Sequence, residues 1–215
     1  MLLEANHISF RYRQGPWILK DVTLSVGEGE RVGLVGPSGY GKSTLSKILA
    51  GYIKPVAGEV LLDGKELPEA GYSPVQLIYQ HPEKAINPLW RMKDILNEGW
   101  VPDQYTLDSM GIEQGWLERW PSELSGGEMQ RFCIARVLGP KTRFLIADEM
   151  STMLDVITQA QIWELMLRIV EDRRMGLIVV THNAALAQKV CTRIISLPEL
   201  NKLNTYAGLP QNGER

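Results

Sequence analysis

One glycine-rich segment has the residue types that bind a phosphate chain. An apolar run of strand character, residues 31–35, precedes it and a helical pattern follows. Glycines let backbone N–H groups turn toward an anion, and a helix N-terminus adds partial positive charge. The segment matches G-x-x-x-x-G-K-[ST] and reads Gly36, Pro37, Ser38, Gly39, Tyr40, Gly41, Lys42, Ser43 and Thr44. It predicts a nucleotide site with Lys42 on the β- and γ-phosphates and Ser43 on Mg²⁺, and the alternative is an ordinary strand-to-helix turn.

Two acidic residues close a second apolar run. Asp148 and Glu149 follow Phe144-Leu145-Ile146-Ala147, which has the composition of a buried strand. A carboxylate in this place holds Mg²⁺ opposite the Ser43 ligand, and its neighbour orients and deprotonates the attacking water. The competing interpretation is a pair of acidic residues at an ordinary loop or helix start.

A second glycine pair stands at the start of a predicted helix. Ser125, Gly126, Gly127 and Glu128 begin an amphipathic stretch at 126–138. A helix N-terminus is an anion-binding cap, yet one phosphate chain cannot use two such caps of the same subunit at once. The pattern therefore predicts a dimer in which this cap covers a nucleotide held by the other subunit. Taken alone, the segment would be only a flexible helix cap.

The elements that must position these residues alternate between strand and helix. Alternating strands at the N-terminus predict an antiparallel β layer, and the later alternation predicts a mostly parallel sheet in an α/β fold. Ligands of such sheets lie beyond the carboxyl ends of the strands. The phosphate loop, Asp148-Glu149 and His182 all follow predicted strands, so we expect them at one site.

The middle of the chain differs in character. Prolines interrupt the stretch 82–124, and it holds four of the six tryptophans, Trp90, Trp100, Trp116 and Trp120. We interpret this stretch as a small helical subdomain with an aromatic core, in which one or two of the tryptophans form a docking surface.

Together these motifs resemble those of the nucleotide-binding subunit of an ATP-binding cassette (ABC) transporter. The resemblance covers residues 2–197 and implies ATP and Mg²⁺ as cofactors. By it, Lys42 is catalytic, and Ser125 through Glu128 contact the nucleotide of the opposing subunit. It also implies catalytic roles for Glu149, His182 and Gln80, with Gln80 touching Mg²⁺ beside Ser43 and Asp148. Tyr12 corresponds to an aromatic that stacks on adenine, with an ordinary strand residue as the alternative, and Asp155 belongs to the D-loop at 151–155.

The resemblance extends to a subgroup and to partners. Gln80-His81-Pro82 followed by Asn87-Pro88 is similar to ATPases of oligopeptide, dipeptide, nickel and metallophore importers. That group implies a second ATP-binding subunit, with a heterodimer favoured and a homodimer open. It also implies transmembrane permease subunits, an extracytoplasmic solute-binding protein and a peripheral position on the cytoplasmic face of the membrane. Met150 departs from the family because a proline usually follows the glutamate, which loosens the backbone after Glu149.

Bulk properties set the remaining limits. The 215 residues predict a single nucleotide-binding domain with its core at 1–81 and 125–198, the helical subdomain at 82–124 and a polar tail at 199–215. A net charge of −2 gives no basic field for nucleic acid. The sequence has no signal-peptide pattern and no apolar run of the ~20 residues that span a bilayer.

Other functions compete with this interpretation. A chromosome-maintenance or repair ATPase of the same superfamily would carry a coiled-coil insertion, and we find no heptad run. A GTP-dependent switch would carry Asn-Lys-x-Asp, whereas the nearest string, Asn201 to Asn204, lacks the aspartate. A kinase that shares only the phosphate loop has no use for residues 125–128. A non-catalytic partner subunit stays open.

Overall fold

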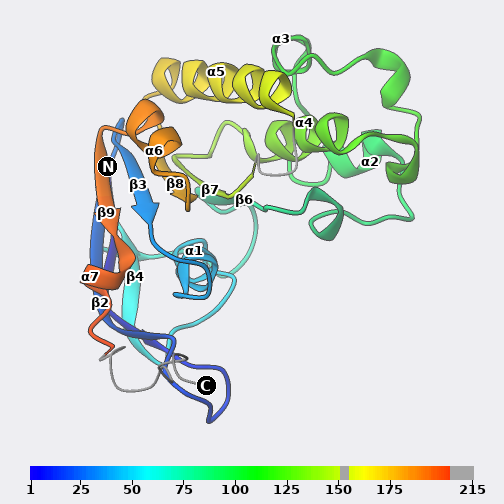
Figure 1. Cartoon of the computed structure of the whole chain (residues 1–215). Helices are drawn as coiled ribbons and strands as arrows, with labels where there is room; N and C mark the ends of the chain where they lie inside the picture. The colour runs from blue at the N-terminus through cyan, green and yellow to red at the C-terminus, as the bar shows by residue number, and fades with distance from the viewer. Residues whose placement is uncertain (151–154, 204–215) are drawn as a thin grey trace, which may run out of the picture.

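Two β-sheets organise the chain in the computed structural model, which describes residues 1–150 and 155–203 (Figure 1). The larger, sheet B, has the strand order β6-β7-β8-β3-β9, and every pair in it is parallel. This confirms the α/β class and the parallel sheet. Its strands are β6 (Val75–Ile78), β7 (Phe144–Asp148), β8 (Gly176–Thr181), β3 (Arg31–Val35) and β9 (Arg193–Ser196).

Sheet B is buried on both faces, which explains why its central strands read as unbroken apolar runs. Every residue of β7 and β8 is buried. Leu145 and Ala147 face one hydrophobic core, whereas Ile146 between them faces the other. Because successive side chains of a strand alternate in direction, one strand can serve two cores only if both of its faces are covered.

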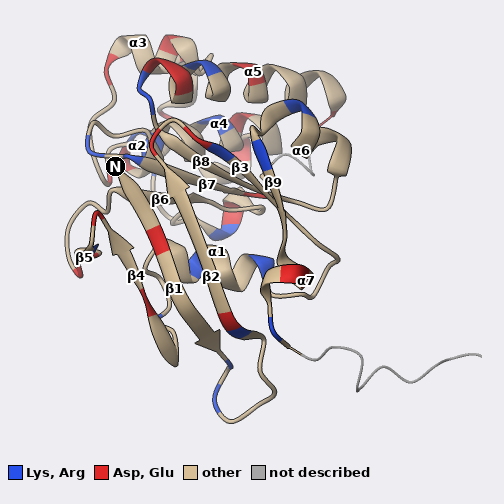
Figure 2. Ribbon diagram, turned by 90° about the vertical axis from the view of Figure 1, so that its left-hand side faces the viewer, with Lys and Arg blue, Asp and Glu red and all other residues tan. Residues whose placement is uncertain are grey.

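Sheet A is the antiparallel layer expected at the N-terminus, with the order β2-β1-β4-β5 (Figure 2). Its strands are β1 (Leu2–Phe10), β2 (Leu19–Gly27), β4 (Ala57–Leu62) and β5 (Lys65–Glu66). Phe10 pairs with Leu19, and the Ile18 N–H donates to the Phe10 carbonyl at 2.9 Å. Residues 11–18 therefore form the loop of a β1–β2 hairpin, and this loop carries Tyr12.

Helices cover both sides of sheet B. Helix α1 (Lys42–Leu49) lies between the two sheets, because Leu45, Ile48 and Leu49 share a core with residues of β1 and β7. Helix α5 (Val156–Asp172) lies on the opposite side of sheet B, where Ile162 and Trp163 join the other core (Figure 1). Helix α4 (Gly126–Val137) packs on β6, and α6 (Ala184–Val190) packs on β3 and β8.

The stretch 82–124 contains only short helical elements. They are η1 (Pro82–Lys84), α2 (Met92–Leu96), α3 (Gln104–Ser109), η2 (Gln114–Trp116) and η3 (Pro121–Glu123). Trp116 is buried and Trp100 packs against the core, whereas Trp90 and Trp120 are exposed. The tryptophans thus divide into two that pack inward and two that face solvent, and the Arg91 guanidinium stacks 4.1 Å from the Trp120 ring.

The chain after β9 does not leave the fold at residue 199, where the sequence suggests a polar tail. Helix α7 (Leu197–Leu200) follows β9 directly and lies beside β2 (Figure 2). Asn201 is buried and the Lys202 N–H donates to the Lys20 carbonyl at 3.0 Å. Within the described ranges, no helix combines the length and apolar character needed to cross a membrane.

Candidate active site

The phosphate loop runs from β3 to α1 and encloses its own lysine. Lys42 is 5% exposed, and its Nζ donates to the carbonyls of Gly36 at 2.8 Å and Pro37 at 2.9 Å. Ser38 and Gly39 at the tip of the loop are exposed, and Tyr40 is half-buried. The ammonium therefore lies where a phosphate oxygen can take the place of a carbonyl, and the N–H groups at the start of α1 face the same anion.

Gly41 caps α1 in a conformation that requires glycine. Its φ is +90°, and an added Cβ would lie 2.8 Å from Ile18 Cγ2. Any side chain here would collide with the base of the β1–β2 hairpin and would also force an unfavourable left-handed backbone. The motif glycine thus serves close packing between the loop and the hairpin, in addition to phosphate binding.

Asp148, at the end of β7, has an unsatisfied buried oxygen. Asp148 is 6% exposed, and its Oδ1 has no hydrogen-bond partner in the described part of the chain. Burial raises the pKa of this carboxyl above its ordinary value, while the hydroxyl of Ser43 and the charge of Lys42 act in the opposite direction. An orphaned carboxylate oxygen beside a serine hydroxyl is a donor set that suits Mg²⁺.

The protein groups that could bind a metal at this position are few. Among the described residues, no group of three or more His, Cys, Asp or Glu side chains is placed to hold a metal ion. Mg²⁺ is commonly bound by one or two carboxylates together with substrate phosphates and water. Asp148 and Ser43 fit this pattern, with Gln80 at the neighbouring strand end.

Glu149 is held between two side chains from the strands on either side. Its Oε2 accepts a hydrogen bond from Gln80 Nε2 at 3.3 Å, and its Oε1 lies 3.1 Å from His182 Nδ1. The three residues follow β6, β7 and β8, which are neighbours in sheet B. The Glu149 side chain is 15% exposed and that of His182 is 55% exposed. The carboxylate is thus partly desolvated, oriented by an amide and an imidazole, and open to solvent on one side, as a group that receives a proton from water must be.

The backbone at Glu149 is unusual. Its φ is +47°, and its N–H donates to the Val180 carbonyl at 3.0 Å. Met150, which stands where the resemblance expects proline, is 2% exposed and packs in the core. The methionine side chain therefore anchors the turn that aims Glu149, a restraint that the sequence did not reveal.

Three of the predicted features, namely residues 125–128, Asp155 with the D-loop, and Tyr12, are not part of the cluster of side chains around Glu149 and the phosphate loop. Ser125 caps α4, and its Oγ accepts from the Glu128 N–H at 3.3 Å while the Glu128 carboxylate accepts from the Ser125 N–H at 2.6 Å. None of the hydrogen bonds or ion pairs of the described residues joins residues 125–128 to the phosphate loop. Asp155 caps α5, and the rest of the predicted D-loop, 151–154, lies outside the described residues.

Tyr12, predicted to stack on adenine, is an exposed residue of the β1–β2 hairpin. Its ring is 51% exposed and meets the edge of the Phe10 ring at a centroid distance of 4.9 Å. The same loop carries Trp17, whose ring lies 4.6 Å from the Arg11 guanidinium and 4.9 Å from the Lys20 ammonium. Sequence reasoning overlooked Trp17, because the sequence does not show that both cations approach its ring.

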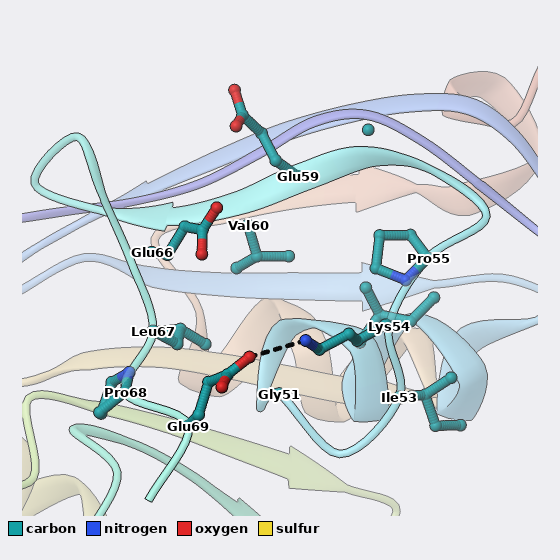
Figure 3. Close-up of a pocket in the computed structure, with 12 residues that line it drawn as sticks. Gly51, Ile53, Lys54, Pro55, Glu59, Val60, Glu66, Leu67, Pro68 and Glu69 are labelled. Carbon is teal, nitrogen blue, oxygen red and sulfur yellow. Dashed lines mark hydrogen bonds and ion pairs between the residues drawn. The ribbon is translucent and has the colours of Figure 1, made fainter.

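A separate pocket lies away from all of these residues. It has a volume of about 540 Å³ and lies between the end of α1 and the β4–β5 hairpin (Figure 3). Its walls combine apolar residues such as Ile53 and Leu67 with acidic ones, and Lys54 spans it to Glu69 at 2.7 Å. None of the predicted site residues lines it, so this concavity has no part in the chemistry of the sheet edge.

Comparison with known proteins agrees with the geometry. The family profile described as "ABC transporter" matches residues 19–152. The nickel import system ATP-binding protein NikE of Staphylococcus aureus (strain bovine RF122 / ET3-1) is 33% identical, over 92% of this chain and 87% of that protein.

Solved structures with the same fold include ATP-binding cassettes. The cassette MJ0796, in a dimeric post-hydrolysis state bound to ADP and Pi, superposes with a TM-score of 0.76 and 26% identity over 90% of this chain and 93% of that one. CbiO1 from Clostridium perfringens, part of the transporter complex cbiONQ, gives 0.75 and 23% identity, with 90% and 83% covered.

The raised pKa of Asp148 generates a stability prediction. The native state holds this proton more tightly than the unfolded chain, so stability falls as pH rises through the window above the ordinary value of 3.8. At pH 7 the buried charge opposes folding in the nucleotide-free protein. Asp148→Asn should therefore raise the urea midpoint at pH 7, and the gain should shrink toward pH 4.

Asp155 is the control for this prediction, because its pKa is shifted in the opposite direction to that of Asp148. Its pKa is lowered by hydrogen bonds from the Thr158 side chain and backbone and from the Ile157 backbone. Its charge therefore favours folding above its ordinary pKa. Asp155→Ala should lower the urea midpoint at pH 7. A lower midpoint for Asp148→Asn as well would show that Asp148 is satisfied in the native state.

Proposed function

This chain belongs to the ABC transporter family as an ATP-hydrolysing subunit, and from that premise we propose that it powers an importer through ATP-driven closure of two such subunits. The observation that carries the proposal is the Glu149 carboxylate held between Gln80 and His182, beside the buried Asp148. Acid–base and metal-binding groups thus converge at one sheet edge, next to a phosphate loop.

Glu149 is the proposed general base. Its carboxylate orients a water and receives its proton as that water attacks the γ-phosphate. The amide of Gln80 holds one oxygen of Glu149, and the imidazole of His182 lies at the other. Lys42 exchanges its two loop carbonyls for phosphate oxygens, which brings its charge to the group being transferred.

Ser43, Asp148 and Gln80 are the proposed Mg²⁺ ligands. When bound, the ion neutralises the charge that develops on the phosphates. The residues fit this role because the free Oδ1 of Asp148 is buried with no hydrogen-bond partner among the described residues. The Ser43 hydroxyl and the Lys42 charge offset the desolvation penalty of this carboxylate only in part, and a bound metal would offset it further.

The capping segment 125–128 is proposed to serve a nucleotide on the opposing subunit. Its glycines are at least partly exposed at the start of a twelve-residue helix, and its side-chain hydrogen bonds stay within that first turn. In such a dimer, each phosphate loop would face the 125–128 segment of the other subunit, so the two subunits would enclose two nucleotides. A related cassette solved as a dimer with ADP and Pi supports this arrangement.

The stretch 82–124, which we treat as a subdomain, is proposed to pass this closure to permease subunits. Gln80 leads directly into it, and Arg136 of α4 ties it down by donating to the Ala85 carbonyl at 2.7 Å and pairing with Glu98 at 3.1 Å. Trp100 Nε1 donates to the Arg136 carbonyl at 2.9 Å. A movement of Gln80 on hydrolysis would therefore be transmitted to the stretch 82–124, which is hydrogen-bonded to α4.

The cargo is proposed to be nickel, free or as a metal chelate, with peptides as the alternative. Two observations support this proposal. The Gln-His-Pro and Asn-Pro motifs follow β6, and the chain is similar to relatives named for nickel import. The complex would comprise a second ATPase subunit, here expected to be non-identical, two permeases and an extracytoplasmic binding protein. This chain would lie on the cytoplasmic face of the membrane.

Replacement of the base tests the catalytic assignment. Glu149→Gln keeps the shape and the hydrogen bond from Gln80 but cannot take a proton. We expect ATP affinity within about twofold of the wild type and turnover at least ~100-fold lower, in the range for loss of a general base. Glu171→Gln, an exposed position on α5, serves as control. Turnover near the wild-type rate in Glu149→Gln would remove Glu149 from this role.

Complementation tests the shared site. Ser125→Arg should leave nucleotide binding by the same chain intact and abolish hydrolysis, whereas Ser122→Arg, three residues earlier and also exposed, should not. Where two copies of this chain pair with each other, mixing Ser125→Arg with Glu149→Gln should restore turnover, because one of the two composite sites then has an intact base and an intact cap. A mixture as inactive as its components would exclude a working homodimer. The same complementation would then be run with Ser125→Arg in this chain and the base variant in the second ATPase subunit, and its failure would contradict the shared site.

Uptake assays test the cargo. Cells that carry this chain with its permeases should accumulate nickel, and the Glu149→Gln variant should reduce that accumulation to the level of cells without the transporter. Dipeptide uptake without nickel uptake would assign the transporter to peptides instead.

A further inference from the structure

The chain after β9 returns to both ends of the phosphate loop. At one end, an added Cβ on Gly36 would lie 3.0 Å from Pro198 Cδ, so α7 packs directly on the first glycine of the motif. Leu197 before it is fully buried. At the other end, Asn201 contacts the strand that lies against Gly41, through the hydrogen bonds described next.

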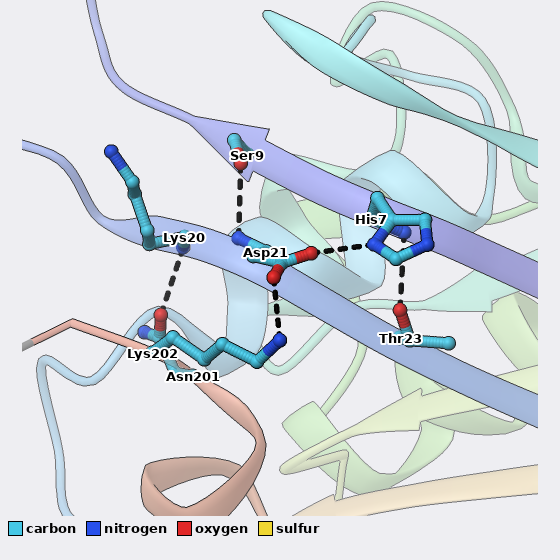
Figure 4. Close-up of polar contacts among 7 residues, drawn as sticks. All are labelled: His7, Ser9, Lys20, Asp21, Thr23, Asn201 and Lys202. Carbon is cyan, nitrogen blue, oxygen red and sulfur yellow. Dashed lines mark hydrogen bonds and ion pairs between the residues drawn. The ribbon is translucent and has the colours of Figure 1, made fainter.

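Both the nitrogen and the oxygen of the Asn201 side-chain amide form hydrogen bonds with the base of the β1–β2 hairpin. Nδ2 donates to the Ile18 carbonyl at 2.8 Å. Oδ1 accepts from the Lys20 N–H at 2.8 Å, as Figure 4 shows. A donor and an acceptor of the backbone thus fix which way the amide points. At 7% exposure these bonds are shielded from water, and a buried polar group left without them would be costly.

The hairpin base that Asn201 holds touches the phosphate loop and supports Tyr12. Ile18 Cγ2 lies 2.8 Å from the place of a Cβ on Gly41, as close as glycine allows. On the other strand of the hairpin, Phe10 accepts from the Ile18 N–H and meets the Tyr12 ring edge-on. A continuous set of contacts therefore runs from Asn201 through residue 18 to Tyr12.

We propose that Asn201 is a positioning residue for nucleotide binding, which holds the 11–18 hairpin against the phosphate loop and so sets where Tyr12 meets the adenine. The inference rests on the proposed function, in which Tyr12 stacks on the base while the loop binds the phosphates. One ligand then spans two elements, and fixing their separation before binding removes an ordering cost from the affinity. The proposal assigns Asn201 no contact of its own with the nucleotide.

Lys202, the next residue, offers a control in the same segment. Its ammonium pairs with Asp21, which also interacts with His7 at 2.6 Å (Figure 4). These side chains are exposed, and exposed ion pairs contribute little. The backbone bond of Lys202 to Lys20 does not depend on its side chain, so Lys202→Ala keeps the segment in place.

A double-mutant cycle on ATP affinity tests the proposal. ATP dissociation constants and steady-state KM and kcat would be measured for the wild type, Asn201→Leu, Tyr12→Ala, the double variant and Lys202→Ala, with urea unfolding of each. We expect Asn201→Leu to raise KM and the dissociation constant about tenfold with kcat within twofold. Lys202→Ala should match the wild type.

The decisive readout is the coupling between the two sites. If Asn201 acts through Tyr12, its replacement has no further effect on ATP affinity once Tyr12 is alanine. Should Asn201→Leu not fold, Asn201→Ala, which is smaller and introduces no charge, takes its place with a shift in the same direction. Additive effects, an unchanged KM, or a lower kcat at unchanged KM would overturn the proposal, whereas a wild type that does not bind ATP would overturn the proposed function itself.

Discussion

The packing of a parallel sheet between two hydrophobic cores is the constraint on which this molecule depends. Strands buried on both faces leave polar side chains only at their ends, and parallel strands bring all their carboxyl ends to one edge. In sheet B, β6, β7, β8 and β3 are consecutive neighbours. The segments that follow them carry Gln80, Asp148 and Glu149, His182 and the phosphate loop. The order of the strands therefore brings segments separated by more than a hundred residues to one site.

Two charged side chains at that edge, Lys42 and Asp148, differ in their hydrogen-bond partners. Lys42 is satisfied by carbonyls of its own loop, whereas Asp148 keeps one buried oxygen with no hydrogen-bond partner among the described residues. The loop is thus arranged before any phosphate binds, and the acid carries an uncompensated desolvation that a metal can relieve. Glu149, in contrast, already has polar partners on both oxygens and keeps access to solvent. Two neighbouring carboxylates thus differ both in burial and in their hydrogen-bond partners.

The site is bounded by elements that belong to other parts of the fold. The β1–β2 hairpin, which carries Tyr12, belongs to the antiparallel sheet, and Asn201 of the segment after β9 hydrogen-bonds to the base of this hairpin. The side-chain hydrogen bonds of the cap at residues 125–128 stay within the first turn of α4. An active site made from such separate pieces can change its geometry when they move relative to one another, as a transport motor must.

Much of this could be derived from the sequence, because the relevant signals are local. The phosphate loop, the acidic pair after a buried strand and the apolar runs depend on neighbouring residues, and they were enough for the α/β class, the family and the convergence of site residues. Tertiary structure alone decided the rest. The strand order placed Gln80 and His182 on either side of Glu149, the core took up Met150, and residues 199–203 pack on the fold although the sequence predicts a polar tail from residue 199. A buried amide such as Asn201 leaves no local pattern, because its partners lie more than 180 positions away in the chain.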